Sequence, residues 1–158
     1  MSDKKKCFVV MGFGEKTDYQ TSRVLDLDKT YKHIIKKAVQ EAGLECVRAD
    51  EIPHAGTIEM PMFEQLLQAD LVIADLSTSN LNAAYELGVR HALKPRTTII
   101  IAHRLSTVRN AHKIVVLDDK SIREVGTHTE LLKLKDGLYR RLYSVQRNLE
   151  PLISSTLN

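Results

Sequence analysis

The sequence predicts an α/β protein in which a doubly wound, mostly parallel sheet carries helices on both faces. Short apolar runs alternate with amphipathic segments along the chain, which is the pattern of successive parallel βα units. Two of these runs, residues 70–76 and 97–103, lack polar alternation and are expected to be central strands covered on both faces. We expect the strand order 2-1-3-4-5, with a sixth, antiparallel strand at the edge.

The strands are predicted from the apolar runs, and most helices are predicted from the spacing of apolar residues and from residues that favour helix ends. The predicted strands cover residues 6–13, 44–50, 70–76, 97–103, 113–119 and 121–126. The predicted helices cover residues 29–42, 61–68, 80–93 and 105–111, and a last helix begins near Thr127 or His128, is interrupted near Asp136 and Gly137, and continues over 137–146. Residues 14–27 are expected to form a polar loop.

End signals fix several helix boundaries. Asp28 is a plausible N-cap for the helix over 29–42, whose apolar residues recur at helical spacing and are expected to face the core: Ile34, Ile35, Ala38, Val39 and Ala42. Gly43 is well placed to end that helix, Pro61 suits a first turn, and Pro95 stops the helix over 80–93. Residues 1–150 are therefore expected to form a single domain, followed by a frayed tail over 148–158.

Composition excludes several classes of protein. The 158 residues carry 43% hydrophobic and 27% charged side chains, as a globular domain does, and the formal net charge is only +3. No nucleic-acid partner is expected, because the Lys4–Lys6 cluster is too small a basic surface. No metal or cofactor is expected, since Cys7 and Cys46 have no further ligand at metal spacing and read as buried, reduced thiols. No apolar run is long enough to span a membrane, so a cytoplasmic setting without a membrane partner is expected.

In a doubly wound sheet, ligands bind beyond the carboxyl ends of the strands where strand order reverses. Here that point lies between the first and third strands, and it brings together residues 12–15 and 75–80. Gly12 and Gly14 could let a backbone approach a phosphate or sugar, although glycines at strand ends also serve ordinary turns.

Residues 6 to about 100 resemble the nucleoside 2-deoxyribosyltransferases and, more distantly, the TIR-type nucleotide hydrolases. The stretches that carry this resemblance are CFVVMGFG, DKTYKHIIKKAVQEAGLECVRAD and DLVIADLSTSNLNAAYELGVRHAL. The resemblance implies a flavodoxin-like fold, a nucleophilic Glu86 and an Asp75 that handles the base. Asn80 stands where those enzymes carry an aspartate six residues before the glutamate.

Two carboxylates at such a site could cleave a glycosidic bond with retention, one as nucleophile and one as acid/base. Asp75 has the alternative role of capping the following helix or its loop through backbone N–H groups. Tyr85, beside Glu86, reads as packing or as a stacking platform for a base. Gly12, Gly14, Asn80 and Tyr85 are thus the candidate ligand-binding residues.

Residues 97 to about 147 resemble the C-terminal end of an ABC exporter's ATPase domain. The stretches RTTIIIAHRLSTVRNAHKIVVLDD, IREVGTHTELL and GLYRRLYSVQ carry this second resemblance. It implies that His103 corresponds to the switch histidine that faces the γ-phosphate of ATP. The sequence contains no GxxxxGK[ST] phosphate loop, no LSGGQ-type signature and no strand ending in Asp-Glu ahead of His103. The expectation is that the chain is not an ATPase and that His103 is vestigial, either a loop residue or a general base.

The two resemblances meet at residues 95–101, which predicts a join there between two lineages. The first hypothesis is an engineered or recombined chimera, or a natural gene fusion, without a biological activity of its own. Lys120 fits this idea, since the ABC pattern usually has glycine in that turn. The alternatives are a residual N-glycosidase or deoxyribosyltransferase at Asp75 and Glu86, and nucleotide binding without turnover. Expected partners are a nucleoside or nucleotide and, through the apolar stripe of the last helix, a second copy of the chain.

Overall fold

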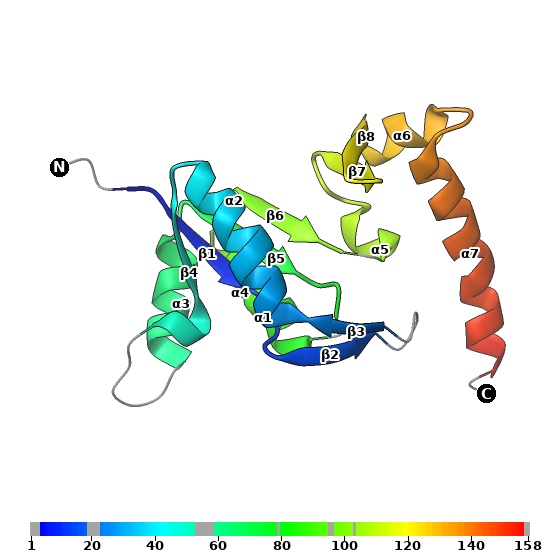
Figure 1. Ribbon diagram of the computed structural model, residues 1–158. Helices are drawn as coiled ribbons and strands as arrows, with labels where there is room; N and C mark the ends of the chain where they lie inside the picture. Colours follow the sequence, from blue (N-terminus) through cyan, green and yellow to red (C-terminus); the bar gives the residue numbers. More distant parts are fainter. Residues whose placement is uncertain are drawn as a thin grey trace. The chain divides into compact units, whose positions relative to one another are not determined.

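The computed structural model describes residues 4–18, 23–52, 59–78, 80–94, 97–102 and 104–156. Backbone proximity divides the chain into two compact units, Met1–His103 and Arg104–Asn158, and each is described by itself (Figure 1). Both units mix helices with strands, so the predicted α/β class is confirmed. The single domain over residues 1–150 stays a prediction.

A parallel sheet of four strands forms the centre of the first unit. Its order is β4-β1-β5-β6, with β1 at Lys6–Val10, β4 at Glu45–Arg48, β5 at Leu71–Asp75 and β6 at Thr98–Ile101. In the numbering of the predicted strands this order is 2-1-3-4. Strand order therefore reverses between β1 and β5, as in a doubly wound sheet.

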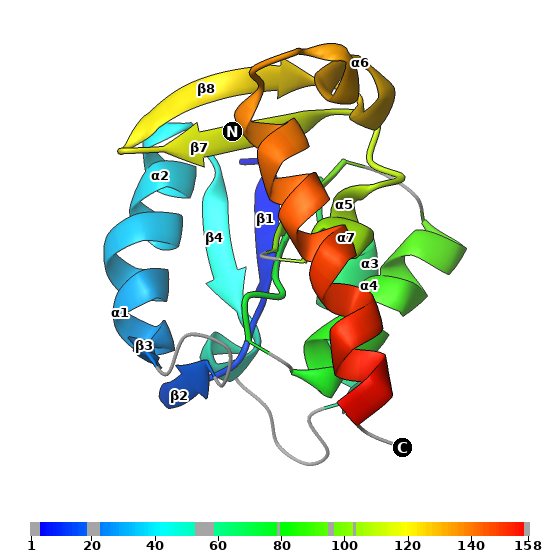
Figure 2. The ribbon, with the colours of Figure 1, turned by 90° about the vertical axis from the view of Figure 1, so that its right-hand side faces the viewer.

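Helices cover both faces of this sheet, and Figure 2 shows the two layers on opposite sides of it. One continuous helical segment covers one face of the sheet; it consists of α1 (Leu27–Thr30), η1 (Tyr31–Ile35) and α2 (Lys36–Glu41). Its buried side chains pack on Cys7, Val9 and Cys46 of the sheet, and they are Leu27, Tyr31, Ile35 and Val39. On the other face, α3 (Glu59–Gln68) and α4 (Leu81–Leu93) pack on Phe8, Val10, Val72 and Ala74. A short 3-10 turn, η2 (Ala49–Glu51), follows β4.

The first helix differs from its prediction in its start and in its buried face. Its N-cap is Asp26, whose side chain accepts a hydrogen bond from the backbone N–H of Lys29, and not Asp28. The buried positions recur every four residues from Leu27, because η1 has the wider π-type turn. Ile34 is therefore 64% exposed. Ala38 and Ala42 are exposed as well, against expectation.

An antiparallel hairpin replaces the loop predicted over residues 14–27. Its strands are β2 (Glu15–Asp18) and β3 (Arg23–Asp26), with Glu15 opposite Asp26 and Asp18 opposite Arg23. Gly14 enters the hairpin at φ 66°, and its carbonyl accepts a hydrogen bond from the backbone N–H of Leu27. Three of the four β2 residues are charged, so the sequence offered no apolar run to mark a strand.

The second unit contains α5 (Leu105–Val108), β7 (Ile114–Asp118), β8 (Ser121–Gly126), α6 (His128–Lys133) and α7 (Leu138–Thr156). β7 and β8 form a two-stranded antiparallel sheet, and Ile114 and Val116 pack on Leu131 and Tyr139. Thr127 caps α6 in a reciprocal arrangement with Glu130, and α6 begins at His128, in agreement with the predicted start near Thr127 or His128. α7 continues to Thr156 and so includes residues 148–156 of the segment predicted as a tail.

The fifth predicted strand is present as β7, which pairs with β8 inside the second unit. Inside the first unit, β6 pairs with β5. The predicted place of the fifth strand beside the fourth stays a prediction, because a continuous apolar run identifies a strand but not its neighbours.

Candidate functional site

The point where strand order reverses brings Gly12 against the loop that follows β5. A Cβ atom placed on Gly12 would lie 3.2 Å from Nδ2 of Asn80 and 3.7 Å from Oγ1 of Thr78. The same Cβ would lie 2.9 Å from Cδ1 of Leu27, at the start of the helix on the opposite face. The structure therefore brings together Gly12 and Asn80, two of the predicted ligand-binding residues.

Asp75 ends β5, next to this point of reversal, and is almost fully buried. Its Oδ1 accepts hydrogen bonds from the backbone N–H of Ser77, at 2.9 Å, and from the Ser77 hydroxyl. These contacts fix the turn between β5 and α4. They correspond to the capping role that the sequence offered as the alternative to catalysis.

Asn80 is the N-cap of α4. Its Oδ1 accepts hydrogen bonds from the backbone N–H groups of Asn82, at 3.0 Å, and Ala83, at 3.3 Å. An asparagine in this role satisfies donors that the first turn of a helix leaves unpaired. The side-chain oxygen of Asn80 is thereby engaged with backbone and serves the fold of the site.

Glu86 and Tyr85 follow on α4 and differ in their surroundings. Glu86 is half-buried, and burial raises the pKa of its carboxyl group above the usual value. Tyr85 is 67% exposed and meets the ring of Phe63 edge-on, with the centroids 6.2 Å apart. Its visible role is packing between α3 and α4. No hydrogen bond joins Glu86 to Asp75 in the part of the chain that the structure describes.

His103, the predicted switch histidine, lies outside the described residues. Among the residues that are described, no group of three or more His, Cys, Asp or Glu side chains could hold a metal ion. Gly14, the remaining candidate, has no heavy atom within 4 Å of a Cβ built on it, and its positive φ serves the turn into β2.

Arg48 is a buried charge that sequence reasoning missed. It ends β4 and is 3% exposed, and its guanidinium forms a bidentate pair with Asp50 at 2.7 Å and an ion pair with Asp28 at 2.9 Å. Burial opposes its charge, but the hydrogen bonds with the two carboxylates outweigh it and hold the pKa of Arg48 above the usual value. The same pair lowers the pKa of Asp50. Phe13 and Tyr31 stack against this guanidinium, 4.9 and 4.4 Å from the ring centroids.

Arg90 is a second buried arginine that the sequence did not reveal. From α4, its guanidinium donates to the backbone carbonyls of Leu66, Leu67 and Ala69 at 2.7, 3.2 and 3.0 Å. Carbonyls at the end of a helix lack partners within it, so Arg90 closes the end of α3. The signal available in the sequence was an arginine on the face that α4 turns to the core.

The second unit carries a polar hollow of about 660 Å³ that the sequence did not predict. It is lined by Leu105, Ser106, Arg109, Asn110, Tyr143, Gln146 and Arg147. Gln146 Oε1 accepts a hydrogen bond of 2.9 Å from the backbone N–H of Leu105, which ties α7 to α5.

Comparison with known proteins links about half of the chain to ABC transporters. ABC transporter B family member 1 of Arabidopsis thaliana is 46% identical over 85 residues, which is 51% of this chain and 7% of that protein. The ATP-dependent lipid A-core flippase of Legionella pneumophila (strain Paris) is 49% identical over 86 residues, 52% of this chain and 14% of the flippase. The mitochondrial potassium channel ATP-binding subunit of Pongo abelii is 52% identical over 79 residues, 48% of this chain and 11% of that subunit.

The chain thus spans only 7% to 14% of the length of these relatives. Among solved structures, a bacterial Atm1-family ABC exporter with ATP bound is similar to 50% of this chain and 14% of its own, at 36% identity and a TM-score of 0.42. No family model matches the chain.

These relatives confirm the resemblance to an ABC transporter ATPase and contradict the function predicted from the sequence. They are named as an ABC transporter, an ATP-dependent flippase and an ATP-binding channel subunit, so the predictions of a chimera without biological activity and of residual deoxyribosyltransferase chemistry at Asp75 and Glu86 are wrong.

One finding bears on the membrane. No helix in the described part of the chain is both long and apolar enough to cross a bilayer.

Proposed function

We propose that this chain supplies a segment of the ATP-binding machinery of an ABC-type transporter. The observation that carries the proposal is the 46% to 52% identity with transporter proteins over about half of the chain. Identity of this degree over about 80 residues is enough to expect a common local structure and a common site. The rest of the relatives' length has no counterpart here.

The chain's own packing supports a self-contained role for residues 104–156. Leu131 and Tyr139 are buried against the β7–β8 hairpin, and the capping box at Thr127 fixes the start of α6. Glu124 of β8 accepts hydrogen bonds from the backbone N–H groups of Leu138 and Tyr139 and so caps α7. A segment held in this way can form one part of a nucleotide site that other residues complete.

The 158 residues contain no phosphate loop, so the proposed role requires phosphate-binding residues from outside them. A phosphate loop binds a nucleotide because successive backbone N–H groups and a lysine surround its phosphates. We therefore propose that these residues do not hydrolyse ATP by themselves. His103 then supplies the imidazole that faces the γ-phosphate, as the resemblance implies.

A segment replacement tests whether the matched residues fit such a machine. In the ATP-binding region of the Legionella pneumophila flippase, the stretch aligned with residues 97–147 is replaced by those residues of this chain, and release of phosphate from ATP is measured. The proposal predicts that the replaced protein keeps hydrolysis within about tenfold of the unaltered region, since the local fold and the histidine are retained.

The matched control carries the same replacement with His103→Ala. The proposal predicts that this single change removes most of the remaining hydrolysis while the protein keeps the same circular dichroism spectrum. A folded replacement that hydrolyses no ATP, or one that is indifferent to His103→Ala, would contradict the proposed role.

A further inference from the structure

Cys7 and Cys46 lie directly opposite each other on neighbouring strands. Their Cα atoms are register partners in the parallel pair of β1 and β4. Neighbouring strands lie about 4.7–4.9 Å apart, which falls within the Cα separation of about 4.4–6.8 Å found for disulfides. Both thiols are free and buried in one hydrophobic cluster beneath the α1–η1–α2 helix. The two sulfur atoms therefore extend from one face of the sheet into the same space.

We propose that Cys7 and Cys46 form a reversible intramolecular disulfide on exposure to a hydroperoxide, which makes this pair an oxidation site of the unit Met1–His103. Composition alone suggested two unrelated reduced thiols. The register of β1 and β4 changes that interpretation, because it places two cysteines that are distant in the sequence opposite each other. The proposal is independent of the nucleotide role, since both cysteines lie outside residues 97–147, the segment that resembles an ABC transporter ATPase.

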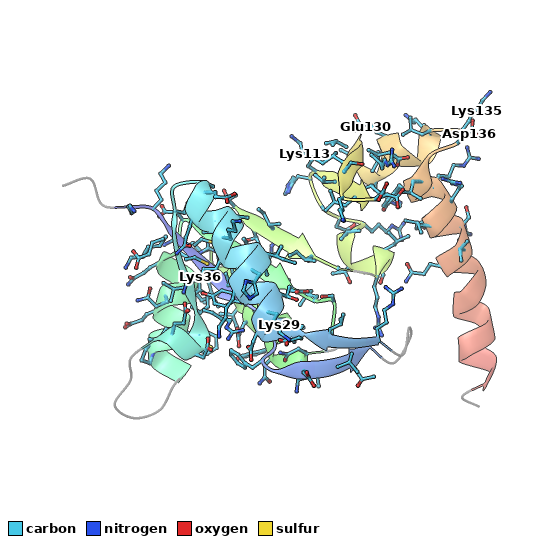
Figure 3. All side chains as sticks on the ribbon, in the orientation of Figure 1. Lys29, Lys36, Lys113, Glu130, Lys135 and Asp136 are labelled. Carbon is cyan, nitrogen blue, oxygen red and sulfur yellow. The ribbon has the colours of Figure 1, made fainter. Side chains whose placement is uncertain are left out.

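A chain of polar contacts connects the buried thiols to the surface. The Cys46 thiol donates to the hydroxyl of Tyr31 over 3.8 Å, and that hydroxyl donates to Oε2 of Glu51 over 2.6 Å. Oε1 of Glu51 pairs with Nζ of Lys36, which lies on the helix above the sheet (Figure 3). Glu51 and Lys36 are both about one-third exposed, so a proton that leaves Cys46 can reach solvent through Tyr31 and Glu51.

The surroundings of the pair select Cys46 as the attacking sulfur. A hydrogen bond from the Cys7 thiol lowers the pKa of Cys46 to about 7, and Tyr31 and Lys36 add to this effect against burial and the charge of Glu51. Cys7, with no such partners beyond Cys46, has its pKa raised by the same hydrogen bond and by burial. A thiolate is the nucleophilic form of cysteine, so the thiolate of Cys46 reacts first.

The chemistry balances with one hydroperoxide molecule. The Cys46 sulfur attacks one peroxide oxygen, the O–O bond breaks, and the departing hydroxide takes up the thiol proton as water, which leaves a sulfenic acid on Cys46. The Cys7 sulfur then attacks the Cys46 sulfur, the S–O bond breaks, and the departing hydroxide takes the Cys7 proton as a second water. The two thiols lose two electrons in total, and the peroxide gains them.

Access and reversibility follow from the position of β4. Among the described residues β4 ends one side of the parallel sheet, so Cys46 is reached by local opening of that side without disruption of β5. The side chains of opposed residues on parallel strands extend side by side. A disulfide between them therefore has a less favourable geometry than a disulfide between unconstrained cysteines. Such a bond is more easily reduced, and we expect a mild dithiol to restore both thiols.

The test treats the native, reduced, full-length protein with hydrogen peroxide and measures intact mass and free thiols. We expect a loss of two hydrogen atoms per chain, a fall from two free thiols to none, a monomer on a non-reducing gel, and full reversal with dithiothreitol. Cys7→Ser should stop the reaction at a sulfenic acid that dimedone traps on Cys46. Cys46→Ser should leave Cys7 unreacted over the same time.

A tyrosine pair separates the proposed proton path from a general effect of mutation. Tyr31→Phe removes the hydroxyl between Cys46 and Glu51, and it should slow oxidation several-fold near pH 7 and shift the pH profile of the rate upward. The exposed Tyr85→Phe should change neither. Two free thiols that persist in excess peroxide while the chain is folded, or disulfides formed only between chains, would overturn the proposal.

Discussion

Gly12 and Asn80 lie against each other where the β1–β2 and β5–α4 connections meet, so that a Cβ on Gly12 would lie 3.2 Å from Asn80 Nδ2. This relationship joins the end of β1 to the N-cap of α4 across the point at which strand order reverses. It leaves room for a hydrogen atom at position 12 and for little else, because Leu27 closes the other side.

Gly12→Ala is therefore expected to destabilise the first unit. The new methyl group would lie 2.9 Å from Cδ1 of Leu27, which is itself buried and cannot swing into solvent. Overpacking of this kind costs about 1–3 kcal/mol. Gly88→Ala on α4 is the matched control: nothing lies within 4 Å of its Cβ position, and it should stabilise the helix by about 0.5–1 kcal/mol. Urea unfolding of both variants tests the contrast, and equal shifts would count against the close approach at Gly12.

Arg90→Met is expected to cost more than a surface substitution of the same kind. It keeps the apolar stem but removes the donors to the carbonyls of Leu66, Leu67 and Ala69, which then stay buried without these partners. The expected loss is about 3 kcal/mol in the free energy of unfolding. Arg23→Met, at an exposed position of β3, should change it by less than about 0.5 kcal/mol. Similar losses in the two variants would refute the capping role of Arg90.

Acid should weaken the first unit through Asp50. Hydrogen bonding to Arg48 lowers the pKa of Asp50 in the folded state, whereas the unfolded chain has the ordinary value of about 3.9. The pair therefore stabilises the fold above pH 4 or so, and this contribution is lost as pH falls through the lowered pKa. Because the Asp50 side chain is 45% exposed, solvent screening limits the contribution to about 0.5 kcal/mol. Asp50→Asn should remove this part of the pH dependence, and an unchanged acid limb in the variant would contradict it.

Lys120→Gly should stabilise the second unit. Asp119 and Lys120 form the turn between β7 and β8 with φ values of 46° and 58°, in the left-handed region that suits glycine. The residue that the sequence marked as an oddity is thus in a strained conformation, and its relief is worth about 0.5–1 kcal/mol. Thermal unfolding followed by circular dichroism should show a higher midpoint. Lys135→Gly, in the loop before α7, should show no gain, and a gain of equal size there would mean that backbone strain at Lys120 is not the cause.

The sequence was most informative where a pattern was local. Apolar runs located β1, β4, β5 and β7, and the predicted helix starts near residue 80 and near Thr127 or His128 agree with the starts of α4 and α6. These features depend on residues within a few positions of one another, so one chain without relatives is enough to read them.

What the sequence could not supply depends on contacts between distant positions. Arg90 donates to backbone carbonyls that lie 21 to 24 residues away along the chain, and Arg48 pairs with Asp28, which lies 20 residues away. Without knowledge of these contacts, both residues look like ordinary surface arginines. The hairpin β2–β3 had no apolar run, and the neighbours of β6 and β7 are set by pairing and not by composition. The pairing of Cys7 with Cys46 likewise exists only in the register of two strands.

The most direct measurement of the proposed function is the rate of phosphate release when this full-length chain is added to the flippase ATP-binding region from which the matched segment has been deleted. The flippase's own excised segment, added in the same way, sets the scale of restored activity. We expect no hydrolysis by either component alone, restored hydrolysis in the mixture, and loss of that activity with His103→Ala. Restoration by the flippase's own segment, together with none by this chain, would contradict the proposed function.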